Sequence, residues 1–235
     1  MEYIFDSLKK AFVLIGTLDN ELLRISWTSI WITGTSVTLA TLFSLPAAVI
    51  IATKRFKGKG ALVTTLNTLM ALPTVVVGLL VYAFLYRRGL LGNFSLLYTP
   101  YAMIIGQVIL ASPIITALTV SALEGADERI EGTALTLGAT KFQALMSLSG
   151  EVRPAITAAV IAGFGRIFAE VGVSMMLGGN IRNYTRNITT AIAFETARGQ
   201  FSLALALGMI LLLFAFTVNI LLQWHLKSQS YYGTK

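Results

Sequence analysis

Two opposite charges interrupt an otherwise uncharged stretch of this sequence. Arg166 and Glu170 are the only charged residues in the predicted helix over 154–178, and their spacing places them on one helix face. Charged side chains are costly at the depth of a bilayer, where they face cavities or bundle interiors and mark pathways for ions. The pair therefore predicts a translocation pathway. The alternative is an ion pair that only holds this helix against a neighbour.

A second polar stretch, ADERIEGTALTLGATKFQAL, occupies positions 126–145. Glu128 to Leu137 predict a helix, and Gly138 suits the left-handed conformation that ends one. Thr140 with Gln143 predicts a capping box that starts a second helix. The expected product is two helices joined at a glycine elbow, and an ordered, partly apolar elbow is typical of a docking site. Its partly apolar surface comprises Ala134, Leu137, Ala139 and Phe142.

These polar stretches lie in a chain whose composition is that of a membrane protein. Of its 235 residues, 55% are hydrophobic and 12% charged, whereas soluble domains carry about 25% charged residues. Its uncharged runs are longer than the roughly 20 residues that cross a bilayer as a helix. The sequence predicts an all-α membrane protein with one domain, residues 1–235. Its five expected spans lie near 25–53, 61–86, 101–123, 154–178 and 202–226.

The first 22 residues differ from these spans because polar and apolar positions alternate with helical period. Ile4, Leu8, Ala11 and Ile15 share one face, while most charged side chains lie off it. This pattern predicts an amphipathic helix over 1–22 that lies along the membrane surface.

The orientation of the chain follows from one basic cluster, KRFKGKG, at the end of the first expected span. Lysine and arginine at a helix end favour the cytoplasmic side. The segment 124–153 is then cytoplasmic, the N-terminus lies outside and the C-terminus inside. Counted over the whole sequence, cluster included, the basic residues are nearly balanced between the two sides, so this orientation depends on the local cluster. The net charge of +7 fits contact with anionic lipid better than nucleic-acid binding.

The sequence contains few of the residues and motifs that metal binding, catalysis and nucleotide binding require. It contains no cysteine and a single histidine, His225, so we expect no metal site and no catalytic set. The phosphate-loop pattern GxxxxGK[ST] is absent, because the glycine–lysine run KGKG lacks its spacing. We expect no enzyme activity and no cofactor in this chain. Energy for transport would have to come from an ion gradient or from another subunit.

The elbow resembles the cytoplasmic signature loop of ABC-importer permeases. Glu131, Ala134, Gly138 and Ala139 stand where that family has its Glu-Ala-Ala…Gly motif, although Gly132-Thr133 departs from it. In the family this loop forms the coupling helix that docks on the ATP-binding subunit. The resemblance thus implies a role in ATPase coupling for Glu131, Ala134, Leu137, Gly138, Ala139, Thr140 and Phe142.

The family also implies the rest of the assembly. We expect the type I (MetI-like) permease fold and a homodimer of this chain in the inner membrane of a prokaryote. Two ATP-binding cassette subunits would bind ATP and magnesium, and an extracytoplasmic binding protein would deliver the solute.

A second resemblance concerns the solute. The segment from Gly165 to Leu212, which contains GGNI and TTAIA, resembles permeases of molybdate-type oxyanion importers, and most of all the tungstate branch. NTLMALPTVVVGLLVY, from Asn67 to Tyr82, fits the same branch. The resemblance implies import of tungstate. Molybdate or another oxyanion is the alternative.

In such a permease we expect a weak passage site and a gate. Arg166 and Glu170 would line the pathway, and Met175, Met176 and Leu177 are gate candidates, with ordinary packing as the alternative for each. An outer polar segment would offer brief hydrogen bonds to the passing oxyanion; it comprises Asn180, Arg182, Arg186, Thr189 and Thr190. Small residues around the pair place the helix over 154–178 at the centre, near the dimer axis.

Two other classes of protein remain as alternatives. A gradient-driven secondary transporter would predict inverted repeats and several acidic residues at membrane depth, whereas this sequence has one buried pair and no convincing repeat. An intramembrane enzyme would need a nucleophile with a base, or metal ligands, within a span, and the sequence offers neither.

Overall fold

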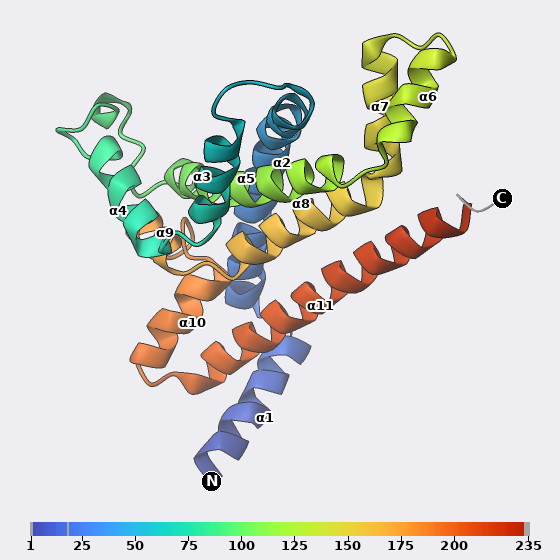
Figure 1. Cartoon of the computed structure of the whole chain (residues 1–235). Helices are drawn as coiled ribbons and strands as arrows, with labels where there is room; N and C mark the ends of the chain where they lie inside the picture. Colours follow the sequence, from blue (N-terminus) through green and yellow to red (C-terminus); the bar gives the residue numbers. More distant parts are fainter. Residues whose placement is uncertain (1, 18, 233–235) are drawn as a thin grey trace.

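The computed structural model describes the backbone of residues 2–17 and 19–232, and the side chains of 5–17 and 19–221. Within these ranges the chain is helical and contains no strand (Figure 1). The helices are α1 Glu2–Gly16, α2 Asn20–Thr53, α3 Lys59–Met70, α4 Thr74–Leu85, α5 Pro100–Glu124, α6 Glu128–Thr136, α7 Lys141–Glu151, α8 Arg153–Phe168, α9 Gly172–Gly178, α10 Ile188–Ala197 and α11 Phe201–Tyr232, with a short 3-10 helix at Gly92–Phe94.

The centre of the molecule is α5, which packs against α2, α3, α4, α8 and α9. Leu110, Ala111 and Ile115 of α5 are buried in one apolar cluster with Val81 of α4 and Val173 of α9. We expected the helix over 154–178 at the centre instead. Within the single chain α5 takes that place, because it has apolar side chains on nearly all of its faces, and such a helix is stable only when neighbours surround it. The position of the helix over 154–178 near a dimer axis stays a prediction.

Three described helices, α2, α5 and the 201–221 part of α11, are each long and apolar enough to cross a membrane. Two further pairs pass the same test together, although they are bent: α3 with α4 by 101°, and α7 with α8 by 67°. If each bent pair is one span, the described chain has up to five. The stretch expected as one span over 61–86 is therefore two helices, and Pro73 is the N-cap of the second.

The stretch expected as one helix over 154–178 is also divided. α8 ends at Phe168 and α9 begins at Gly172. The Glu170 side chain accepts a hydrogen bond from the Val173 backbone N–H at 3.2 Å, which satisfies a donor that the new helix start leaves free. The glycine pair then ends α9, with Gly179 in the left-handed conformation at φ +68°.

Two other boundaries differ from the expected ones. The helix expected over 1–22 ends at Gly16, and a new helix begins at Asn20, where the Asp19 carboxylate caps two backbone N–H groups. α10 was not expected at all. Asn187 caps its first turn, and the Ile188 N–H donates to Ser29 Oγ of α2 at 2.6 Å, so a distant helix fixes where α10 starts.

The antiparallel pair α6–α7 projects from the rest of the molecule, at the opposite end from the N-terminus (Figure 1). α6 packs mainly on α7, and α7 continues into α8 through the bend. This projecting pair, residues 128–151, is called the elbow below.

Candidate functional site

The turn of the elbow has the geometry that its sequence predicts. Gly138 lies at φ +88°, where only glycine is unstrained. Thr140 and Gln143 form a capping box in which the Thr140 N–H donates to Gln143 Oε1 at 2.8 Å and the Gln143 N–H donates to Thr140 Oγ1 at 3.3 Å. Local interactions therefore hold the turn in one conformation.

The tip of the elbow exposes its largest apolar side chains. Leu137 is 83% exposed and Phe142 is 72% exposed. Ala134 and Ala139, which we expected on the same surface, are partly buried. A leucine and a phenylalanine held this far out on an ordered turn form an apolar surface that nothing in the described chain covers.

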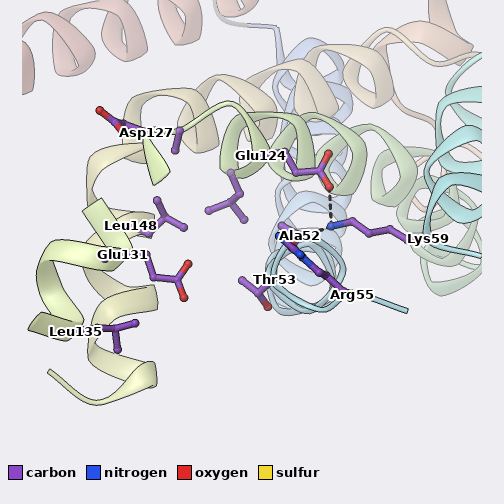
Figure 2. A pocket seen from close by; sticks show the side chains of 12 residues that line it. Ala52, Thr53, Arg55, Lys59, Glu124, Asp127, Glu131, Leu135 and Leu148 are labelled. Atoms are coloured by element: carbon purple, nitrogen blue, oxygen red, sulfur yellow. Dashed lines mark hydrogen bonds and ion pairs between the residues drawn. The ribbon is translucent and has the colours of Figure 1, made fainter. Parts of the chain in front are cut away.

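Glu131 lies on another side of the elbow. It faces a cleft of about 600 Å³ between α6 and the end of α2, with Thr53 and Arg55 on the opposite wall (Figure 2). At the base of this cleft Lys59 Nζ contacts Glu124 Oε1 at 2.8 Å and donates to the Ala52 carbonyl at 2.7 Å. Lys59 therefore ties the ends of α2 and α5 to the start of α3.

The pair predicted inside a span is present. Arg166 Nη1 lies 3.1 Å from Glu170 Oε2; the glutamate is almost fully buried and the arginine is partly exposed. Thr189 Oγ1 donates to the Glu170 backbone carbonyl at 2.8 Å, which links α10 to the break between α8 and α9. Glu170 thus organises a helix break as well as pairing with Arg166. Irregular backbone at membrane depth is tolerated where protein or a cavity surrounds it.

The three gate candidates lie in different surroundings on α9. Leu177 is fully buried, with its side chain against Gly106 of α5. Met176 packs its sulfur against Gly78 of α4, where an added Cβ would lie 3.0 Å away. Met175 is partly exposed. In this conformation Leu177 is part of the core. Gly78 and Gly106 have no side chain, which lets α9 pack closely against α4 and α5.

The hydroxyl groups of the outer polar segment make internal hydrogen bonds. Thr190 Oγ1 accepts the Asn187 N–H at 3.1 Å, and Thr189 is bonded to Glu170 and Asn187. Both threonines are buried. They therefore hold the start of α10 in place, and neither hydroxyl points to solvent in this conformation. Asn180, at φ +50°, follows the glycine pair.

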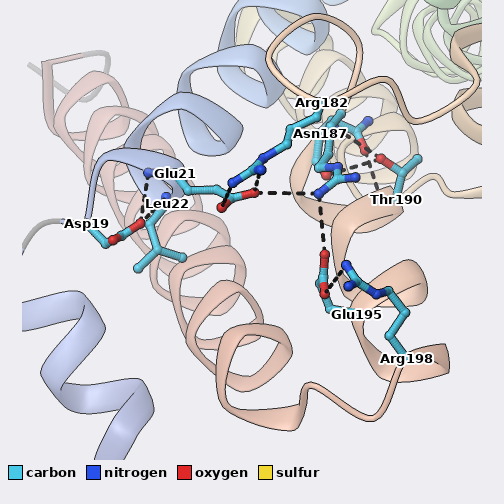
Figure 3. A network of polar contacts seen from close by, with 9 residues as sticks. Asp19, Glu21, Leu22, Arg182, Asn187, Thr190, Glu195 and Arg198 are labelled. Atoms are coloured by element: carbon cyan, nitrogen blue, oxygen red, sulfur yellow. Dashed lines mark hydrogen bonds and ion pairs between the residues drawn. The ribbon is translucent and has the colours of Figure 1, made fainter.

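The two arginines of that segment belong to a set of five charged side chains that we call the outer charge network: Glu21, Arg182, Arg186, Glu195 and Arg198. Arg182 donates to Glu21 through Nε at 3.1 Å and Nη2 at 2.7 Å. Arg186 Nη1 lies 3.5 Å from Glu21 and 3.3 Å from Glu195, and Arg198 lies 3.7 Å from Glu195 (Figure 3). Charges of opposite sign alternate along this chain, which joins α2, the 179–187 loop and α10.

An aromatic ring and a cavity accompany this network. Two guanidinium groups lie over the Phe194 ring, that of Arg186 at 4.9 Å and that of Arg198 at 5.3 Å from the ring centre. The network lines a cavity of about 320 Å³. Hydrogen bonding to Glu21 raises the pKa of Arg182, so this guanidinium stays charged at every accessible pH.

Comparison with known proteins identifies the family. A family profile described as "Binding-protein-dependent transport system inner membrane component" matches residues 44–230. The chain belongs to this family. It is therefore a membrane component of an importer that works with a binding protein.

Individual relatives support the same grouping. The permease is 37% identical to a tungstate uptake system permease protein of Peptoclostridium acidaminophilum, over 93% of this chain and 96% of that protein. A molybdenum transport system permease protein of Escherichia coli K12 is 28% identical, over 80% of this chain and 90% of that protein. The fold matches a chain of the MetNI methionine ABC transporter in its inward-facing form, with a TM-score of 0.73 at 16% identity, covering 88% and 95% of the two chains. The permease thus has the MetI-like fold.

The outer polar segment predicted from the sequence left out three members of the outer charge network, Glu21, Glu195 and Arg198. Glu21 lies near the start of α2, and its partner Arg182 is far along the permease chain. The sequence does contain a pattern for Glu195 and Arg198: their i,i+3 spacing beside Phe194 places them on one helical face and could have predicted their ion pair.

Proposed function

We propose that this permease is the membrane subunit of an ATP-driven importer that carries tungstate into the cytoplasm. The proposal is carried by the 37% identity to a tungstate uptake permease over nearly the whole chain. The lower identity to a molybdenum permease makes molybdate the second choice. An external binding protein would supply affinity and selectivity, because a membrane site that bound tightly would slow release.

The elbow supports docking on a separate ATPase subunit. Leu137 and Phe142 are the exposed apolar side chains at its tip, and apolar side chains of this size act as anchors when a partner covers them. ATP and magnesium would bind to that subunit. The permease would receive the resulting motion through α7 and the bend into α8.

The surface of α8 supports pairing with a second copy of the chain. Ala158, Ala162, Gly165 and Ala169 recur at helical spacing and are exposed in the single chain. Small side chains let two helices approach closely within a membrane. Arg166 and Glu170 lie on the same helix or at its end, so a pair of permeases would bring two such charged pairs near one axis.

The arrangement of the ends supports the expected orientation. The basic loop 54–59 and the elbow line the same cleft, and the outer charge network lies at the other end of α2. With basic residues inside, the elbow faces the cytoplasm, the N-terminus lies outside and the C-terminus inside.

The test is tungstate uptake by proteoliposomes that contain the permease, an ATP-binding cassette subunit and an external oxyanion-binding protein. We expect tungsten to accumulate only when all three and ATP are present. Uptake by the permease alone, driven by an ion gradient, would instead assign it to secondary transporters. Molybdate uptake that exceeds tungstate uptake at equal concentration would reverse the choice of solute.

Arg166→Ala separates a pathway from a structural role in the same preparation. Loss of uptake with normal assembly supports the pathway. Normal uptake and normal assembly together would remove Arg166 from both roles.

A further inference from the structure

The outer charge network carries more positive than negative charge. Three arginines, Arg182, Arg186 and Arg198, share two carboxylates, Glu21 and Glu195. A network that served only to join helices would gain most from equal numbers of each sign. The excess positive charge at the outer end of the molecule lies where an incoming anion would first meet the protein.

The two carboxylates of this network are held differently. Glu195 is 2% exposed and contacts both Arg186 and Arg198, so it is a permanent part of the fold. Glu21 is 26% exposed and lies in the first turn of α2. A partly exposed side chain can leave its partners at low cost, because solvent compensates its charge.

The Glu21 carboxylate occupies the position that an oxyanion would take. It accepts from Nε and Nη2 of Arg182 at 3.1 and 2.7 Å, which is the two-pronged contact that guanidinium groups make with carboxylates and phosphates alike. It also lies 3.5 Å from Arg186. With Glu21 withdrawn, the three arginines face one carboxylate, and the net charge of two matches a tetrahedral dianion.

The buried position of Arg186 adds to this picture. Its side chain is only 10% exposed, and its enclosed Nε makes no hydrogen bond within the described part of the chain. A buried donor without a partner is costly, and a shift of the Arg186 side chain on loss of Glu21 would let this Nε reach an acceptor in the cavity. Arg186 lines the 320 Å³ cavity, which also contains the other members of the outer charge network.

We propose that Arg182, Arg186 and Arg198 form an outer receiving site for a tetrahedral oxyanion, and that Glu21 is its internal competitor. This inference rests on the proposed function in its choice of cargo. The anion leaves the binding protein, displaces Glu21 from Arg182 and Arg186, and is released when Glu21 returns. Competition of this kind keeps the site weak, as passage requires.

The test uses the permease–ATPase complex in lipid nanodiscs, without the binding protein. Arg182 and Arg198 are 64% and 53% exposed, so phenylglyoxal can modify them and peptide mass spectrometry can quantify each. We expect sodium tungstate to slow modification of both arginines. In Glu21→Gln, the tungstate concentration for half-protection should fall about tenfold, since the competing carboxylate is gone.

Asp19→Asn is the matched control. It removes one negative charge two residues away, and Asp19 caps α2 without contacting an arginine of the network. Asparagine is an equally good cap, so the fold is kept. We expect its half-protection concentration to stay within about twofold of the unmodified chain, because Asp19 accepts from the backbone N–H groups of Glu21 and Leu22 and occupies no guanidinium of the network. A tenfold fall in this variant too would reduce the effect to net charge and overturn the competition.

Arg182→Gln provides a second variant with little risk to folding, because Arg182 is largely exposed. Half-protection of Arg198 should then need several-fold more tungstate. Equal protection by sulfate or molybdate supports the site, since the chemistry is shared. Equal protection by chloride at matched ionic strength overturns it, as does unchanged protection in Glu21→Gln.

The two proposals fail in different ways. Intact ATP-driven tungstate uptake without arginine protection would reject the receiving site and leave the proposed function in place. Protection by oxyanions without any tungstate uptake would keep the site and reject the cargo.

Discussion

The two ends of this permease treat their side chains in opposite ways. The elbow holds large apolar side chains out in solvent, at 83% exposure for Leu137. The end that carries the outer charge network encloses charged side chains, at 2% exposure for Glu195. Each arrangement is costly for a chain taken by itself. The elbow lacks a partner that another protein would supply, whereas the outer end supplies nearly all of its own partners.

The two ends are therefore suited to different kinds of binding. When a docking partner covers exposed apolar surface, the removal of that surface from water favours the complex. A network of charges that are already paired adds little free energy to association with another protein, but a small ion can replace one of its charged members. The elbow is therefore suited to a lasting subunit contact, and the outer charge network to brief exchange with a small anion.

The largest effect should come from the buried acid of the outer charge network. Glu195→Gln leaves Arg186 and Arg198 without their shared carboxylate, and loss of one member of a buried pair costs about 3 kcal/mol. Unfolding by SDS titration in mixed micelles measures it. Glu131→Gln is the control, because Glu131 lies in an open cleft and makes no ion pair within the described residues. If both variants lost the same free energy of unfolding, the acid of the network would be no more important for stability than the acid of the elbow.

The next effect is at the tip of the elbow. Replacing Leu137 and Phe142 together by serine should weaken association with the ATPase subunit at least tenfold, or about 1.4 kcal/mol, while the permease stays folded. Surface immobilisation of the permease and titration with the ATPase subunit measure the affinity. Leu213→Ser is the control for loss of a large apolar side chain away from the elbow, since Leu213 is 68% exposed in the single chain and lies in the part of α11 that is long and apolar enough to cross a membrane. An unchanged affinity of the double variant would make the elbow a simple connector.

A smaller effect tests whether the shape of the elbow matters. Gly138 lies at φ +88° and Gly132 has an ordinary helical backbone, and an added Cβ has free space at both. Gly138→Ala should therefore cost about 1 kcal/mol of strain, while Gly132→Ala should slightly stabilise α6. Hydrogen exchange of the α6 and α7 amides measures both. Similar exchange in the two variants would show that the turn tolerates other conformations.

The smallest effect is that of salt. Raising sodium chloride from about 0.1 M to 1 M shortens the screening length from about 10 Å to 3 Å. Oxyanion protection of Arg198 should weaken several-fold, whereas elbow docking should hold or strengthen because it buries apolar surface. The two assays above, repeated at both concentrations, check this. If docking weakened as much as protection, charge would dominate both ends.

Features set by neighbouring residues were predictable from the sequence. The left-handed Gly138 and the Thr140–Gln143 capping box are both present, because each depends on contacts within a few residues. The Arg166–Glu170 pair is present too, because the two residues are only four positions apart and Glu170 lies just past the end of α8, within reach of Arg166.

Features set by distant residues were not predictable. α10 starts where Ser29 of α2 accepts the Ile188 N–H, and no local pattern announces that contact. The break before α9 is held by Glu170 from within and by Thr189 from α10. Glu21 joined the candidate site only because the fold brings it to Arg182. Hydropathy locates apolar stretches, but it does not say where packing divides them.

The length of α2 has a mechanical consequence. This helix has 34 residues, which is about 51 Å of rod at 1.5 Å per residue. One end carries Glu21 and the other reaches the cleft beside the elbow, where Ala52 accepts a hydrogen bond from Lys59. A tilt of about 5° about the midpoint would move each end by about 2 Å in opposite directions. If α2 tilts as one rigid body, a shift large enough to free one guanidinium of the outer charge network would be matched by an equal and opposite shift at the end beside the elbow.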